Sequence, residues 1–113
     1  MKQVILVNEA LGLPRGKLAA QVAHASVASL LSTRVEAQKE WFGVGMPKVV
    51  LAVDDEETLL AFFEQAREAD LPTQIIRDAG KTVVEAGTIT CVGIGPSTPE
   101  QIDEITGELS LLR

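Results

Sequence analysis

Runs of consecutive apolar residues alternate along the chain with longer stretches in which apolar residues recur every three or four positions. The runs are short, rich in β-branched residues and bounded by loop-forming residues, so they predict four buried strands. These runs span residues 3–8, 48–53, 73–77 and 88–94. The stretches with the longer period predict helices. They span residues 17–32, 36–43, 54–69 and 98–106.

Two of the predicted helices carry an apolar stripe that identifies the face to be buried. In the first helix the stripe consists of Leu18, Val22, Ala25, Ala28 and Leu31, with the small Ser29 beside it. In the third helix the stripe consists of Leu59, Leu60, Phe63 and Ala66 or Arg67. The last helix begins with Thr98 as its N-cap and Pro99 at its first position. The tail after it, residues 109–113, is expected to pack back as an edge.

Strands that alternate with helices predict an α/β fold, in which a small mixed sheet is covered on both faces by helices. A length of 113 residues suits one domain. No repeat, linker or charge tract marks a second one. We therefore expect a single domain over residues 1–113.

Hydropathy excludes a membrane-spanning class. The longest apolar runs have about five residues, whereas a helix needs roughly 18 to 20 to cross a bilayer. The first apolar run, at residues 4–7, is also too short for the core of a signal peptide and has no small-residue cleavage site behind it. The sequence therefore predicts no membrane association and a cytoplasmic location.

Composition excludes several kinds of site. One cysteine and one histidine cannot form an internal disulfide or a His/Cys zinc site. A net charge of −6 argues against coating nucleic acid by bulk electrostatics, although a local basic patch remains compatible with it. Aromatic residues are only 4 % of the chain, which disfavours a platform for stacking single-stranded bases.

The first predicted helix carries polar side chains at positions that share one face. Lys17, Gln21 and His24 are spaced by four and three residues, starting in the first helical turn. Free backbone N–H groups and the helix dipole attract an anion at that end, and Lys17 adds a full charge. The alternative is structural, with His24 partly buried and Lys17 solvated.

A second polar group follows the third predicted strand. Residues 78–82 (Asp-Ala-Gly-Lys-Thr) lie at a strand end, where open α/β sheets usually build their sites, although the same residues also form ordinary turns. Thr88 and Thr90 alternate along the next strand, so we expect both hydroxyls on one side of it. Cys91 is then expected on the opposite face, as a small buried apolar residue rather than a nucleophile.

Known phosphate-binding and nucleophile motifs do not fit. Three residues separate Gly12 from Gly16 where a P-loop needs four, and Leu18 stands where its Ser or Thr should be. No third glycine follows residues 93–95, which disfavours a dinucleotide site. No serine lies in a nucleophile-elbow context. Attack by an oriented water molecule is therefore the simplest chemistry for the polar residues.

Four separated blocks of the sequence, in collinear order, closely resemble the type II peptidyl-tRNA hydrolases, the class typical of archaea and eukaryotes. The blocks are residues 16–25, 78–82, 87–96 and 105–112. The resemblance implies a three-layer α/β/α sandwich around a four-stranded mixed sheet. It also implies an enzyme that hydrolyses the ester joining a peptide to the 3′ ribose of tRNA, with no obligatory cofactor or metal. Homodimers are common in the family, so a homodimer is an expectation.

The resemblance also assigns candidate residues. The positions that match the family's proposed active site are Lys17, Gln21, His24, Asp78, Thr82, Thr88 and Thr90. As hypotheses, Asp78 would orient or deprotonate the attacking water and Lys17 would stabilise developing negative charge. A threonine would hold the water or the ester, while His24 would polarise or shuttle a proton and Gln21 would fix its partners. The basic residues expected to meet the acceptor end of tRNA are Arg15, Lys17, Lys48, Arg77 and Lys81.

Two other functions remain open from the sequence. One is a binding module for tRNA or a ribosome-associated protein, without turnover. The other is an esterase or amidase for a different acyl conjugate. Salt dependence separates tRNA binding from the binding of a small neutral ester, because contacts to phosphates weaken steeply as ionic strength rises.

Overall fold

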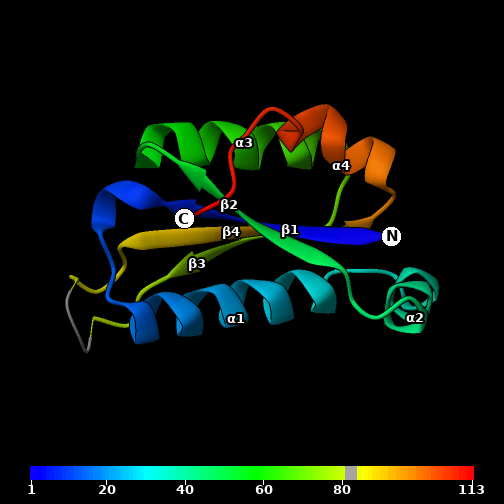
Figure 1. Ribbon diagram of the computed structural model, residues 1–113, viewed down its shortest axis with the longest axis horizontal. Helices are drawn as coiled ribbons and strands as arrows, with labels where there is room; N and C mark the ends of the chain where they lie inside the picture. Colours follow the sequence, from blue (N-terminus) through cyan, green and yellow to red (C-terminus); the bar gives the residue numbers. More distant parts are fainter. Residues whose placement is uncertain (81–83) are drawn as a thin grey trace.

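The computed structural model describes residues 1–80 and 84–113 and contains one four-stranded sheet with helices on both faces (Figure 1). The strands are β1 (Lys2–Asn8), β2 (Lys48–Val53), β3 (Thr73–Arg77) and β4 (Ile89–Ser97). The helices are the short 3₁₀ helix η1 (Glu9–Leu11), α1 (Arg15–Leu31), α2 (Val35–Gly43), α3 (Glu56–Glu68) and α4 (Pro99–Thr106). The predicted elements are therefore confirmed, with β2 and β3 at the predicted bounds.

The sheet is mixed, in the order β2-β1-β4-β3. β1 pairs in parallel with β2 and antiparallel with β4, and β4 pairs antiparallel with β3. The C-terminal tail adds a short contact at the β2 edge, since the Ala52 amide donates to the Ser110 carbonyl at 2.9 Å and the Leu112 amide to the Val50 carbonyl at 3.0 Å. The expectation that the tail packs back as an edge is confirmed.

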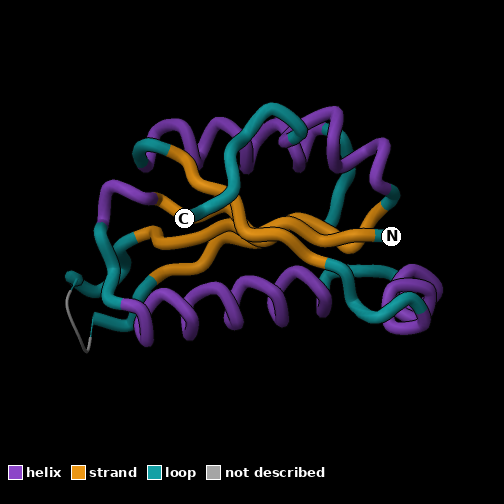
Figure 2. The backbone as a smooth tube through the Cα atoms, viewed as in Figure 1, coloured by secondary structure: helices purple, strands orange, loops and turns teal. Residues whose placement is uncertain are grey.

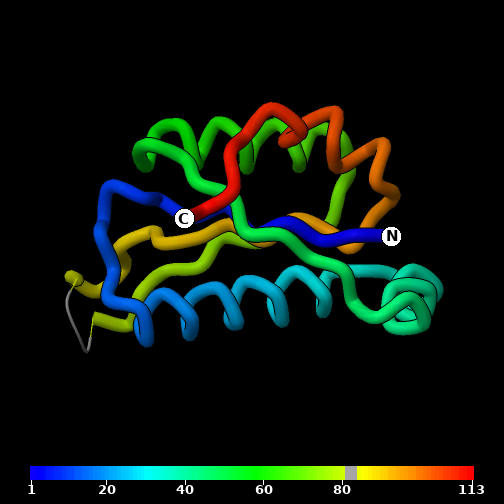
Figure 3. The backbone as a smooth tube through the Cα atoms, in the orientation of Figure 1, coloured from blue at the N-terminus to red at the C-terminus, as the bar shows by residue number. Residues whose placement is uncertain are grey.

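Helices lie on both faces of the sheet, so the predicted layered architecture is confirmed (Figure 2). α1 runs along one face, and α3 and α4 lie over the other, as the tube in Figure 3 also shows. Each face has its own apolar cluster. Val4, Leu6 and Leu59 belong to the cluster under α3, whereas Ile5 and Ala25 belong to the one under α1. No helix in the described part of the chain is long and apolar enough to cross a membrane.

The buried face of α1 differs from the predicted apolar stripe. Gln21, Ala25 and Ser29 are buried, whereas Leu31 is 75 % exposed. The cause is close packing on β4: a Cβ added at Gly93 would lie 2.4 Å from the Ala25 carbonyl oxygen. Only small or hydrogen-bonding side chains fit at this contact, and the Ser29 hydroxyl donates to the Gly95 carbonyl at 2.5 Å. The prediction that Leu31 lies on the buried face is therefore wrong.

Candidate active site

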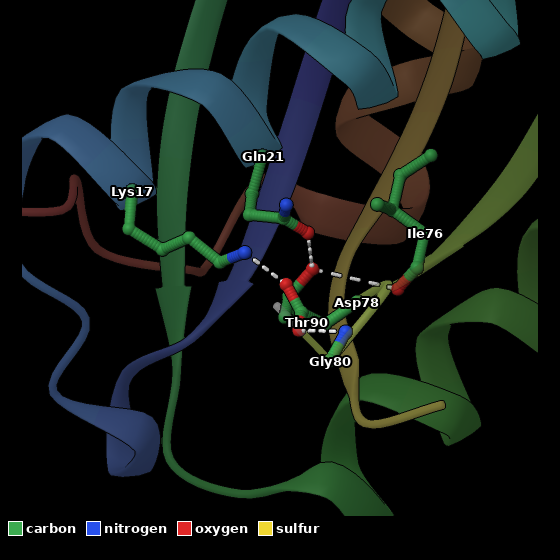
Figure 4. A network of polar contacts seen from close by, with 6 residues as sticks. All are labelled: Lys17, Gln21, Ile76, Asp78, Gly80 and Thr90. Carbon is green, nitrogen blue, oxygen red and sulfur yellow. Dashed lines mark hydrogen bonds and ion pairs between the residues drawn. The ribbon is translucent and has the colours of Figure 1, made fainter. Parts of the chain in front are cut away.

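An ion pair joins two segments that are distant in the sequence. Lys17 lies in the first turn of α1, and Asp78 directly follows β3. The Lys17 ammonium contacts Asp78 Oδ1 (Figure 4). The Asp78 side chain has no exposed surface, whereas 15 % of the Lys17 side chain remains exposed. The pair therefore presents its lysine, and not its carboxylate, to solvent.

Backbone groups fix the position of Asp78. Its Oδ2 accepts a hydrogen bond of 2.6 Å from the Gly80 amide, and its own amide donates to the Thr88 carbonyl at 2.8 Å. The Gly87 amide donates to the Asp78 carbonyl at 2.8 Å. Gly80 has a φ of +77°, and a Cβ there would lie 2.5 Å from the Ala86 Cβ, so the loop depends on a glycine at this position.

These contacts keep Asp78 ionised. The neighbouring Lys17 ammonium is the main cause that lowers the pKa of Asp78 below its ordinary value of 3.8; burial acts in the opposite direction and the Gly80 amide lowers the pKa further. A carboxylate with a lowered pKa accepts a proton weakly. Asp78 is therefore better suited to holding the ammonium than to deprotonating water.

A second buried pair lies beside the first. The Thr90 hydroxyl donates to Gln21 Oε1 at 2.5 Å and lies 3.4 Å from the Ile76 carbonyl oxygen (Figure 4). Gln21 and Thr90 are 4 % and 0 % exposed. The bond uses only the oxygen of the Gln21 amide. In residues 1–80 and 84–113, the amide nitrogen has no hydrogen-bond partner. That nitrogen can therefore donate to a substrate oxygen.

A β-bulge directs Thr90 toward α1. Ile76 pairs with Cys91, but Arg77 pairs with Ile89, so Thr90 is one extra residue in β4. A bulge interrupts the alternation of side chains and redirects one of them. Cys91 also packs toward α1, in the cluster with Ala25. The prediction that Cys91 lies on the face opposite Thr90 is therefore wrong, while its burial is confirmed; burial also raises the pKa of its thiol to about 11.

The side chains of two further candidates, Thr88 and His24, take no part in this network of contacts. Thr88 is half-buried and contributes its backbone carbonyl, and no side-chain hydrogen bond of Thr88 is present in the described residues. His24 is exposed on α1 and has no ion pair or hydrogen bond to another described side chain. Lys81 and Thr82 lie outside the described residues. The catalytic roles of His24, Thr82 and Thr88 and the tRNA-binding role of Lys81 stay predictions.

The basic candidates divide between the two ends of the sheet. Arg15 and Arg77 are exposed near the Lys17–Asp78 pair, the first at the start of α1 and the second at the end of β3. Lys48 pairs with Gln3 at the opposite end of the sheet, and its ammonium lies 5.1 Å from the centre of the Trp41 ring. Lys48 therefore does not flank the ion pair, contrary to expectation. Whether it binds tRNA stays a prediction.

The site suits stabilisation of negative charge by a fixed ammonium. Free N–H groups at the start of α1 add a positive potential close to Lys17. In residues 1–80 and 84–113, no three His, Cys, Asp or Glu side chains cluster closely enough to hold a metal ion. The Gly80 amide is the contributor that sequence reasoning missed. The Asp-x-Gly pattern, in which an aspartate accepts from the amide two residues later, is the signal for it.

Comparison with known proteins supports the family suggested by the sequence. The family model described as "Peptidyl-tRNA hydrolase PTH2" matches residues 1–112. A protein of Methanopyrus kandleri named "Peptidyl-tRNA hydrolase" is 51 % identical over 99 % of this chain and 98 % of its own length. Proteins with the same name from Sulfolobus acidocaldarius and Haloquadratum walsbyi are 48 % and 45 % identical. The alignments cover 99 % and 98 % of this chain and 100 % and 99 % of those proteins.

Proposed function

This chain belongs to the peptidyl-tRNA hydrolase PTH2 family. We propose that it hydrolyses the ester between peptide and tRNA by direct attack of water, and that Lys17 stabilises the transition state. The activity follows from the full-length relatives. The ion pair between Lys17 and the buried Asp78 is the observation that carries the mechanism. The substrate is the acceptor end of a peptidyl-tRNA, and the product tRNA returns to translation in the cytoplasm.

Lys17 acts on the charge that develops during attack. When water adds to the ester carbonyl, the carbonyl oxygen becomes an oxyanion, and an ammonium fixed beforehand stabilises it without reorganisation. Collapse of this intermediate breaks the ester bond, the peptide leaves as a carboxylic acid, and a proton released by the water ends on the 3′ oxygen of the ribose. Asp78 keeps the Lys17 side chain in place. The chemistry needs no covalent intermediate, because an ester is activated more easily than an amide and no serine or cysteine nucleophile is in position among the described residues.

Gln21 and Thr90 orient the reacting groups. The Thr90 hydroxyl fixes the Gln21 amide, whose nitrogen donates to the attacking water or to the ester carbonyl. His24, exposed one turn further along α1, polarises a substrate group or carries a proton. Thr82 and Thr88 complete the site as further hydroxyl donors. Arg15, Arg77 and Lys81 meet phosphates near the 3′ end, and Lys48 lies further from it.

Hydrolysis of a labelled N-acetyl-aminoacyl-tRNA by the purified protein tests this proposal. We expect release of free tRNA, and loss of most turnover in Lys17→Met, which keeps the length of the side chain but not its charge. Lys39→Met, on the exposed side of α2, is the control and should hydrolyse normally. Salt-dependent binding of tRNA without turnover would identify a binding module instead.

A homodimer is the assembly that the surface favours. Val27, Leu31 and Val35 are 56 %, 75 % and 58 % exposed on or next to the outer side of α1. Burying such side chains in an interface is favourable. Light scattering should give twice the mass of one chain for the protein and the mass of one chain for Leu31→Glu. The monomer mass for both proteins would contradict the homodimer.

A further inference from the structure

Two arginines that are absent from the predicted tRNA-binding set line one cavity of about 530 Å³. They are Arg34, between α1 and α2, and Arg67, near the end of α3. Ser32 and Thr33 add hydroxyl groups to the lining, and Asp70 is its carboxylate. The cavity therefore gathers positive charge on a chain whose net charge is −6.

Neither guanidinium is engaged by a carboxylate in the described part of the chain. The ion pairs there are Lys2–Asp103 and Lys17–Asp78. The guanidinium carbon of Arg67 lies 5.5 Å from the centre of the Phe63 ring, a contact that does not use the N–H donors. A guanidinium presents its donors in a planar fork that matches the oxygens of a phosphate. Two such groups facing one cavity suit a phosphate ligand.

The cavity and the catalytic pair lie at opposite ends of the same sheet edge. β3 is the edge strand; Thr73 and Gln74 at its start line the cavity, and Asp78 directly follows its last residue. Figure 3 shows the tube of α1 running between the same two ends. Lys17 lies in the first turn of this helix. The lengths of β3 and α1 put the separation at about 15 to 25 Å. Arg77 is the exposed last residue of β3 and directly precedes Asp78.

We propose that this cavity, lined by Arg34 and Arg67, binds a backbone phosphate in the acceptor stem of the tRNA. The inference rests on the proposed function, since it takes peptidyl-tRNA as the substrate. A strand advances about 3.4 Å per stacked nucleotide, so the phosphate lies roughly four to seven nucleotides from the scissile ester. The contact anchors the tRNA while leaving the chemistry at Lys17 unchanged.

Steady-state kinetics of Arg34→Gln and Arg67→Gln test the proposal. With N-acetyl-aminoacyl-tRNA, each variant should raise KM about three- to fivefold with kcat unchanged. The slope of log KM against log salt concentration should fall by about one, the mark of a lost phosphate contact. Lys39→Gln, which removes the same charge from the exposed side of α2, should change neither quantity.

A short substrate locates the contact. The same acyl group on a CCA trinucleotide cannot reach the cavity, so its KM should be equal for wild type and both arginine variants. An unchanged KM for the full tRNA would overturn the proposal, and so would an equal rise for the trinucleotide. If Arg34→Gln and Arg67→Gln weaken the binding of inorganic phosphate but leave the KM for the full tRNA substrate unchanged, the cavity binds a free anion. That result would overturn the proposed contact to tRNA. Wild-type hydrolysis of the full substrate is measured first. A protein without hydrolase activity is then recognised before the contact at the cavity is tested.

Discussion

In the described part of the chain, the buried Asp78 Oδ1 accepts no hydrogen bond, and its one polar partner is the Lys17 ammonium. Loss of Lys17 would leave a carboxylate oxygen buried without compensation, and loss of the Asp78 charge would leave Lys17 with one restraint fewer. The two residues are therefore expected to behave as a unit in stability and in catalysis. This coupling is the basis of the predictions on pH and on catalytic rate.

Asp78→Asn should change the pH dependence of stability. The folded-state pKa of Asp78 is lowered, so its ion pair stabilises the protein above the ordinary pKa of 3.8. This contribution is lost as pH falls through the lower, folded-state pKa. The difference in free energy of unfolding between wild type and variant should be constant above about pH 5 and shrink below pH 3.8. Urea titrations at several pH values measure it, and a difference that grows on acidification would contradict the assignment.

Thr90→Val should lower both stability and kcat. The valine cannot donate to Gln21 Oε1, and an unpaired buried acceptor costs about 1–3 kcal/mol. Thr106→Val is the matched control, because Thr106 is also buried and its hydroxyl donates to the Ile102 carbonyl in α4, on the far face of the sheet. The control should lose stability but keep its kcat. An equal effect of both variants on kcat would show that Thr90 is only structural.

Gly93→Ala should loosen α1 from the sheet. The added Cβ would lie 2.4 Å from the Ala25 carbonyl oxygen, and overpacking of this kind costs about 1–3 kcal/mol. Gly43→Ala, where a Cβ meets no atom within 4 Å, should leave stability unchanged or raise it slightly. Thermal unfolding compares the two variants. Because α1 carries Lys17 and Gln21, we also expect Gly93→Ala to lower kcat, and an unaffected Tm would contradict the packing argument.

Local patterns in the sequence were sufficient to predict the sheet and helix order. The β-branched runs gave β2 and β3 at their observed bounds, and the Thr98–Pro99 pair marked the start of α4. Lys17 and Asp78 were also candidates from their positions at element ends, and the resemblance to the type II peptidyl-tRNA hydrolases assigned both to one site. These features depend on a few neighbouring residues, which is the range over which propensity acts.

Features set by contacts between distant segments could not be predicted in this way. The burial of Ser29 depends on the close approach of Gly93 in β4. The burial of Gln21 depends on Thr90, which is 69 residues further along the chain. The bulge at Thr90 depends on the pairing of β4 with β3, and it turns Thr90 to the same face as Cys91, contrary to expectation. The position of Lys48 depends on the parallel pairing of β1 with β2, which places the start of β2 away from the Lys17–Asp78 pair.

A double-mutant cycle on kcat/KM tests the central claim most directly. Lys17→Met should lower kcat/KM by about 10²- to 10³-fold, the usual loss when one stabiliser of an oxyanion is removed. Asp78→Asn should lower it less, because it acts through the position of Lys17. The account predicts that Asp78→Asn causes no further loss once Lys17 is replaced. Losses that multiply in the double variant would show that Asp78 acts on the reaction independently, as a proton acceptor, and would contradict the account.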